Sequence, residues 1–210
     1  MAGWRLESPR VLVVDLDGGG GGAVRAATGS MVAYEGDVTF RNAGFGGGGG
    51  LRAALKQRVT GESLDLMEVT GRGTVHFAVG AGHVLVVDLA GDVLKAESQS
   101  LLALSDPLRT DVTFTGLQGA SSGQGLFTTT VSGHGQVALI SLGGPPIALR
   151  VSPGTPLVVD PDAYIGAVGQ LQQSFVSDVS WRNLIGESSG EAFSLRFEGQ
   201  GVVYLQPEER

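Results

Sequence analysis

The sequence predicts an all-β fold, and two observations support that prediction. Short, β-branched apolar runs recur along the chain and are separated by glycine, proline and aspartate. A pattern of predicted strand, Gly-x-Gly and predicted strand occurs three times in the sequence. Its glycine pairs are Gly71/Gly73, Gly133/Gly135 and Gly199/Gly201. We expect a single domain, a β-sandwich or β-helix-like closed barrel of three pseudo-repeats of about 60 residues each.

Each repeat is expected to run through a strand, a turn, a strand pair, a further strand, a glycine-rich insertion and a hairpin. Closure of the three repeats would remove exposed sheet edges. The expected boundaries are an N-terminal lead-in at 1–10, one domain at 11–206 with repeats at about 11–80, 81–142 and 143–206, and a tail at 207–210.

The first repeat opens with a buried strand over Val11–Leu16. Gly18–Gly22 is a loop, because five glycines cannot hold a strand, and no Lys-Ser or Lys-Thr follows to make it a phosphate cradle. Val24–Phe40 predicts a strand, a turn at Glu35–Asp37 and a second strand.

One short helix is predicted, near residues 51–59. Leu51, Leu55 and Val59 share an i, i+4 face there, and Gly61 follows as a C-terminal cap.

The Gly-x-Gly pairs predict tight hairpin turns that require positive φ. Their middle residues differ (Arg72, His134 and Gln200), which favours a structural turn over a ligand site. In the strand after the first pair, Val75 and Phe77 fall on one face and His76 on the other.

The later repeats contain the same kinds of run. A turn at Ala90–Asp92 is expected to separate two strands of the second repeat. The expected strands are His83–Leu89, Val93–Glu97, Leu101–Leu104, Val112–Phe114, Ile147–Val151, Leu157–Asp160 and Val179–Trp181.

Composition narrows the function classes. The 210 residues carry a net charge of -7, which disfavours broad electrostatic capture of nucleic acid. The chain has no cysteine and therefore no thiol chemistry. No apolar run reaches a membrane span and the N-terminus has no apolar signal core, so we expect a cytoplasmic bacterial protein.

No catalytic signature stands out. His76, His83 and His134 are dispersed, without metal-ligand spacing, and no serine stands in a nucleophile elbow. We predict no catalytic residue, no cofactor and no metal. Trp4 and Trp181 are expected to be packing residues.

One local basic feature surrounds the second glycine run. Arg41, Arg52, Lys56 and Arg58 flank Gly46–Gly50. Backbone N–H groups at a helix start, together with these side chains, could form an anion or lipid-headgroup site. An ordinary solvated helix face is the competing interpretation.

Several motifs resemble a known family. They are the run at 49–64 (GGLRAALKQRVTGESL), Gly-Gln-Gly-Leu-Phe at 123–127 and Ser-Gly-His-Gly at 132–135. In this order they resemble the family named in yeast for altered inheritance of mitochondria, the twenty-fourth such protein. The resemblance implies a fold similar to that of the tryptophan-RNA-binding attenuation protein and no established enzymatic activity. Asp65 stands where the family pattern has an apolar residue.

These inferences together predict a non-enzymatic structural or protein-interaction module that self-associates or binds another protein. No small-molecule substrate is indicated. The alternative is a module that binds an anion, a lipid headgroup at a membrane surface, or nucleic acid through the basic helix at 51–59 and its glycine loop. The net negative charge makes nucleic acid the weakest of these ligands.

Overall fold

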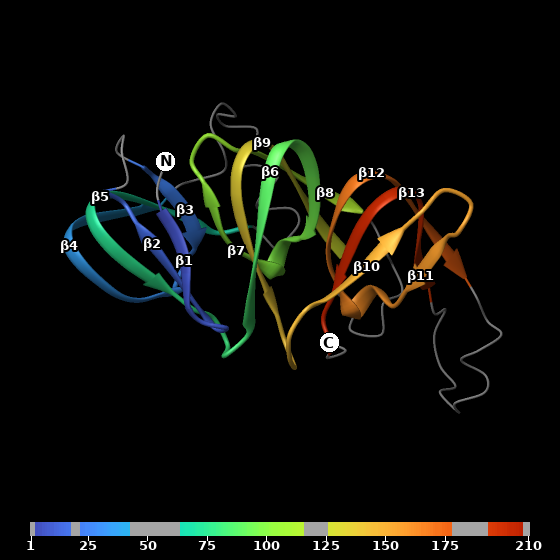
Figure 1. Cartoon of the computed structure of the whole chain (residues 1–210), viewed down its shortest axis with the longest axis horizontal. Coiled ribbons are helices and arrows are strands. Elements are labelled where there is room, and N and C mark those ends of the chain that lie inside the picture. Colours follow the sequence, from blue (N-terminus) through green and yellow to red (C-terminus); the bar gives the residue numbers. More distant parts are fainter. Residues whose placement is uncertain (1–2, 18–21, 43–63, 116–125, 178–192, 208–210) are drawn as a thin grey trace.

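The computed structural model describes residues 3–17, 22–42, 64–115, 126–177 and 193–207. Almost all of this part is strand (Figure 1). The strands are β1 (Gly3–Ser8), β2 (Val11–Asp15), β3 (Val24–Ala27), β4 (Met31–Asn42), β5 (Leu66–Phe77), β6 (His83–Glu97), β7 (Leu101–Ser105), β8 (Arg109–Thr115), β9 (Leu126–Ser141), β10 (Ile147–Val151), β11 (Leu157–Val159), β12 (Tyr164–Ser177) and β13 (Phe193–Leu205). Two single-turn 3-10 helices, η1 (Ser98–Ser100) and η2 (Pro161–Ala163), precede β7 and β12.

The described strands form one antiparallel sheet of thirteen strands, which confirms the all-β prediction. The hydrogen-bonded path runs β1-β2-β5-β3-β7-β9-β6-β12-β13-β10, with β4, β8 and β11 attached beside it. The path begins at β1 and ends at β10, and these two strands do not pair with each other, so the expected closed barrel is wrong. The helix predicted near 51–59 lies outside the described residues.

Three groups of strands lie side by side along the molecule: β1–β5, β6–β9 and β10–β13 (Figure 1). Each group curls over an apolar core, and the second group also contributes Val84, Leu102 and Ile140 to the first core. The faces of the sheet are thereby covered without closing its ends. The three cores contain Leu12, Val14, Val69, Val75 and Phe77 in the first group; Leu89, Leu94, Leu104, Val131 and Leu139 in the second; and Val159, Tyr164, Leu195, Phe197 and Val203 in the third.

The predicted Gly-x-Gly hairpin turns are wrong, because each glycine pair lies inside one long, bent strand. β5 runs without interruption through Gly71 and Gly73. Before the pair it hydrogen-bonds β3, and after the pair it hydrogen-bonds β2, while β4 follows its other side throughout. β9 changes partner from β8 to β7, and β13 from β11 to β10, in the same way. The glycines mark corners at which a strand passes from one layer of its group to the other.

These corners need glycine for two reasons. Gly71 and Gly73 have φ of 124° and 133°, where L side chains are strained. A Cβ at Gly71 would also collide with the carbonyl oxygen of Asp37, and a Cβ at Gly73 with that of Glu35. The expectation of positive φ at this pair is therefore confirmed, although the chain bends there instead of reversing.

The turns predicted at Glu35–Asp37 and Ala90–Asp92 fail for the same reason. β4 continues through Gly36, whose φ is 96°, and β6 continues through Gly91, whose φ is 100°. A β-bulge between Ala90 and Val93 provides the extra bend in β6.

Other expectations for the early part of the chain have mixed outcomes. The strand predicted over Val11–Leu16 is confirmed as β2. The N-terminal lead-in, however, contains β1, which pairs with β2 and packs Trp4 against the first core. Asp65 is exposed and immediately precedes β5, so the position that breaks the family pattern lies just outside the strand.

Polar side chains connect neighbouring groups. Arg25 of β3 donates hydrogen bonds to the carbonyl oxygen of Leu108 and, at 3.4 Å, to Thr110 Oγ1. Burial lowers the pKa of Arg25, and the charges of Asp106 and Glu68 act in the opposite direction. The half-buried Arg25 guanidinium therefore lies at the contact between the first and second groups of strands.

Candidate interaction surface

The predicted basic site is described only at Arg41. That residue is exposed near the end of β4 and stands opposite Glu68 of β5 in the sheet register. Arg52, Lys56 and Arg58 lie outside the described residues, so the structure does not bring the four together.

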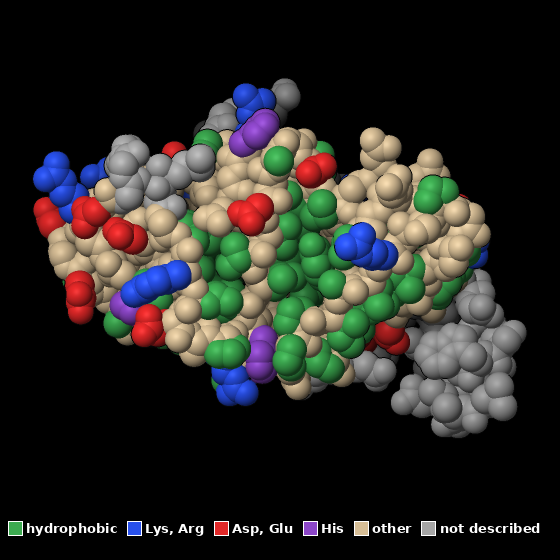
Figure 2. Space-filling view, in the orientation of Figure 1, with side chains coloured by type: hydrophobic (Ala, Val, Ile, Leu, Met, Phe, Trp, Pro, Cys, Tyr) green, Lys and Arg blue, Asp and Glu red, His purple; other side chains and the backbone are tan. Residues whose placement is uncertain are grey.

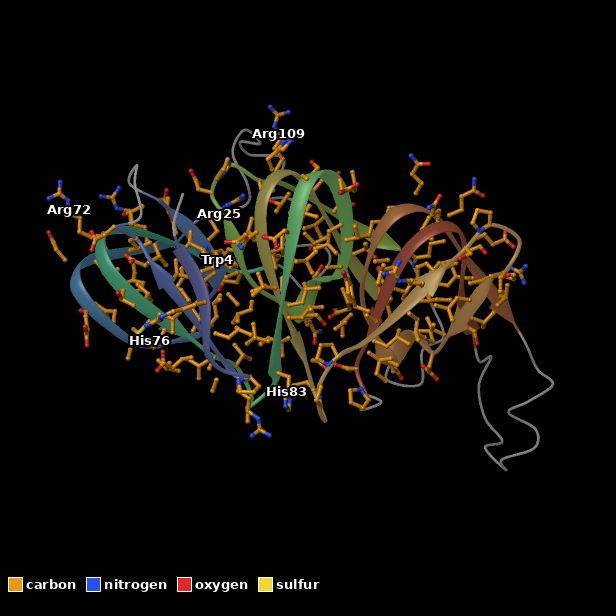
Figure 3. All side chains as sticks on the ribbon, viewed as in Figure 1. Trp4, Arg25, Arg72, His76, His83 and Arg109 are labelled. Atoms are coloured by element: carbon orange, nitrogen blue, oxygen red, sulfur yellow. The ribbon has the colours of Figure 1, made fainter. Side chains whose placement is uncertain are left out.

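Three other arginines lie apart from one another. Arg72 is exposed at a corner of the first group, Arg109 is exposed on the second, and Arg25 is half-buried between them (Figure 3). Within the ranges that the structure describes, these cations do not make one basic surface.

The histidines also lie on separate elements. His76 is half-buried in β5, with a shielded Nδ1 that has no hydrogen-bond partner in the described part. His83 opens β6, and His134 is exposed at the corner of β9 (Figure 3 labels the first two). Among the described residues, no group of three His, Asp or Glu side chains is placed to hold a metal ion.

The most distinctive surface feature is apolar. A groove of about 630 Å³ is lined by Leu6, Glu7, Ser8, Pro9, His83, Val84, Pro145 and Pro146. Leu6 is 45% exposed, and Ile147, next to Pro146, is 44% exposed. Figure 2 shows hydrophobic side chains gathered across the middle of the molecule, and Figure 3 places His83, which lines the groove, at the lower margin of the same view. We call Leu6, Pro9, Val84, Pro145 and Ile147 the apolar face.

Three distant segments build the apolar face. The end of β1 and the turn after it supply Leu6 and Pro9, and the Pro9 carbonyl accepts a hydrogen bond of 2.8 Å from Val84 N. The segment between β9 and β10 supplies Pro145. The Ser141 hydroxyl holds that segment by donating to the Gly144 carbonyl at 2.8 Å, which fixes the prolines beside β6.

The end of β1 and the segment that leads into β10 both line this groove. β1 hydrogen-bonds only β2, and β10 hydrogen-bonds only β13, among the strands that the structure describes. An edge strand leaves backbone N–H and C=O groups unpaired, and exposed apolar side chains beside such an edge favour contact with another protein chain. Sequence analysis missed this surface because it took residues 1–10 for a lead-in.

In the part of the chain that the structure describes, no helix is long and apolar enough to cross a membrane.

The fold defines the class of protein: an all-antiparallel β protein in which three curled groups of strands share one open sheet. The chain belongs to the AIM24 family, described as mitochondrial biogenesis AIM24, whose family model matches residues 4–208. The resemblance noted in the sequence is thereby confirmed.

A solved bacterial structure has the same fold. The crystal structure of protein SPYM3_0169 from Streptococcus pyogenes superposes with a TM-score of 0.75 at 22% sequence identity, and the alignment covers 100% of this chain and 94% of that one. No curated protein matches the chain.

Proposed function

We propose that this protein is a non-enzymatic interaction module that associates with a second copy of itself through the apolar face. The observation that carries the proposal is one exposed apolar groove, lined by the end of the edge strand β1 and by the proline segment that leads into the edge strand β10. Burial of Leu6 and Ile147, each more than two-fifths exposed, would supply the favourable free energy of association.

A two-fold dimer suits this surface. In a two-fold interface the same patch contributes from both copies, so it must be complementary to itself. Glu7 lines the groove and forms an exposed ion pair of 3.5 Å with Arg5, so charges of both signs stand beside the apolar side chains and can pair across such an interface.

The anion-binding alternative receives less support. Of its four basic residues, only Arg41 is described, and Glu68 stands opposite it. No described contact, cavity or charge cluster favours that function over self-association.

Sedimentation velocity tests the proposal. We expect the wild-type protein to shift from monomer to dimer over a micromolar concentration range. Leu6→Lys and Ile147→Lys each place a charge in the buried interface and should weaken dimerisation by at least about tenfold. The matched control is Val158→Lys, an equally exposed apolar position (46%) on β11, whose partner Arg196 is nine residues along β13 from Leu205, the partner of Ile147. A wild-type protein that stays monomeric at every concentration would refute the proposal, as would Val158→Lys acting like the other two.

A further inference from the structure

A cavity of about 920 Å³ lies where the third group of strands meets β6. Its lining comes from β12 and β13 near their bends at Gly169 and Gly199, from residues 152–156 between β10 and β11, and from Val93 and Lys95 of β6. The volume is within the range of small-molecule sites. The residues of the apolar face do not line this cavity, so the two are separate.

One side of the sheet supplies both an apolar wall and a cation. Ala167 and Leu171 pack on the third core, whereas Val168 packs on the second, so the odd-numbered residues of this part of β12 point into the third group. Lys95 stands opposite Ala167 in the sheet register and therefore points to the same side, as does Val93 two residues before it. All of these side chains except Val168 line the cavity, so one ligand can contact them together.

Lys95 gives the lining an excess positive charge. It is exposed, and in the described part of the chain its ammonium group makes no ion pair. The other two charged residues of the lining neutralise each other, because Arg196 donates to Glu198 Oε1 through Nε at 2.9 Å and through Nη2 at 2.6 Å. The lining thus has one cation in excess, although the whole chain carries a net charge of -7. Such a site favours a ligand with a single negative charge.

Apolar surface lies beside this ammonium group. Val93 is 40% exposed and Leu171 is half-buried, so both retain surface that a ligand can cover. Pro153 and Pro156 add ring carbons from the segment between β10 and β11. The apolar body of a ligand would leave water against these side chains, which favours binding. A phosphate ester would bring almost two negative charges to one unpaired cation, so a carboxylate is the better match.

We propose that this cavity binds an apolar monocarboxylate. Its carboxylate oxygens would accept hydrogen bonds from Lys95 Nζ, and its apolar body would pack on Val93 and Leu171. Fatty acids and aryl-substituted acids share this chemistry. The proposal does not depend on self-association.

Calorimetric titration of the full-length chain with octanoate and with phenylacetate tests this proposal and distinguishes the two sources. We expect at least one of these acids to bind, and Lys95→Met to weaken that binding by at least about tenfold, the effect of losing one charge-assisted hydrogen bond. Lys95→Arg keeps the positive charge and should retain most of the affinity. The matched control is Arg150→Met, because Arg150 is exposed on β10 and lies outside the lining.

A second variant tests the apolar wall. Val93→Trp, at an exposed position, should fill part of the cavity and weaken binding of the acid while Lys95 remains in place. Octanol, which keeps the chain of octanoate and lacks its charge, should bind the wild type and Lys95→Met with equal, low affinity.

Two results would overturn the proposal. One is the absence of binding for both acids, including the case in which inorganic phosphate binds instead and assigns the cavity to phosphorylated ligands. The other is carboxylate binding that Lys95→Met leaves unchanged, which would place the ligand elsewhere on the protein.

Discussion

Tyr164 shows how a single residue joins two groups of strands. It is fully buried, its hydroxyl donates to the Lys95 carbonyl of β6 at 2.7 Å, and its ring stacks on Phe197 with 5.5 Å between centroids. Burial raises the pKa of the Tyr164 hydroxyl, and the charge of nearby Glu97 raises it further. The neutral phenol is therefore the form that the folded protein requires.

This raised pKa predicts a loss of stability in alkali. Above about pH 10 the unfolded chain releases the Tyr164 proton while the folded protein retains it, so the free energy of unfolding falls as pH rises past that value. Tyr164→Phe should cost about 1 kcal/mol at pH 8, because the Lys95 carbonyl loses its donor. The advantage of the wild type should then shrink between pH 10 and 11 in urea titrations. Tyr34→Phe, at an exposed ring, should follow the wild-type profile. Parallel profiles for wild type and Tyr164→Phe would contradict this account.

At the scale of elements, the sequence predicts where strands lie better than how they are joined. Alternating apolar residues such as Val75 and Phe77 identify a buried face, and both are buried in β5. Gly71 and Gly73 signal positive φ, but a hairpin turn and a corner in a continuous strand both require it. Whether a hairpin turn or a corner forms depends on which strands pair on either side of the glycines. The local sequence does not determine that pairing.

The candidate surface was harder to predict, for a related reason. Leu6, Val84 and Pro145 come from segments more than 60 residues apart, and none belongs to a motif with a recognised spacing. Only the fold brings them together. The same holds for the cavity in the third group, whose lining combines residues of β12 and β13 with the Ser152–Pro156 segment and with Val93 and Lys95 of β6.

The close contact at the Gly71 corner can be tested by comparison with Gly29, where a side chain would be disfavoured by the backbone conformation but would meet no neighbouring atom. Gly29 has φ of 82° and open space around it, so Gly29→Ala should cost about 1–2 kcal/mol. At Gly71 the methyl group would also strike the Asp37 carbonyl, forcing β4 away from β5. We expect Gly71→Ala to cost at least about 3 kcal/mol in urea denaturation. Equal losses for the two variants would show that the close approach of β4 does not constrain the corner.

At the scale of the whole molecule, the open sheet decides which assemblies are available. Edge strands could join copies end to end, β1 of one to β10 of the next, and such contacts propagate into rings or filaments. The end of β1 and the segment that leads into β10 instead line one groove. A pair of copies that cover this groove mutually makes it unavailable to a third copy.

The absence of native cysteine allows this closed arrangement to be tested directly. The double variant Leu6→Cys, Ile147→Cys should react with a short bismaleimide to give covalent dimers and no larger species, because a two-fold contact places both cysteines of each copy within the same pair. End-to-end association would instead produce a ladder of trimers and higher oligomers on a denaturing gel. Val158→Cys, equally exposed but on β11 outside the apolar face, should remain monomeric. Since each copy carries a net charge of -7, salt should increase the dimer yield by screening the repulsion between copies. A ladder would refute the two-fold arrangement while preserving self-association, and monomers alone would refute both.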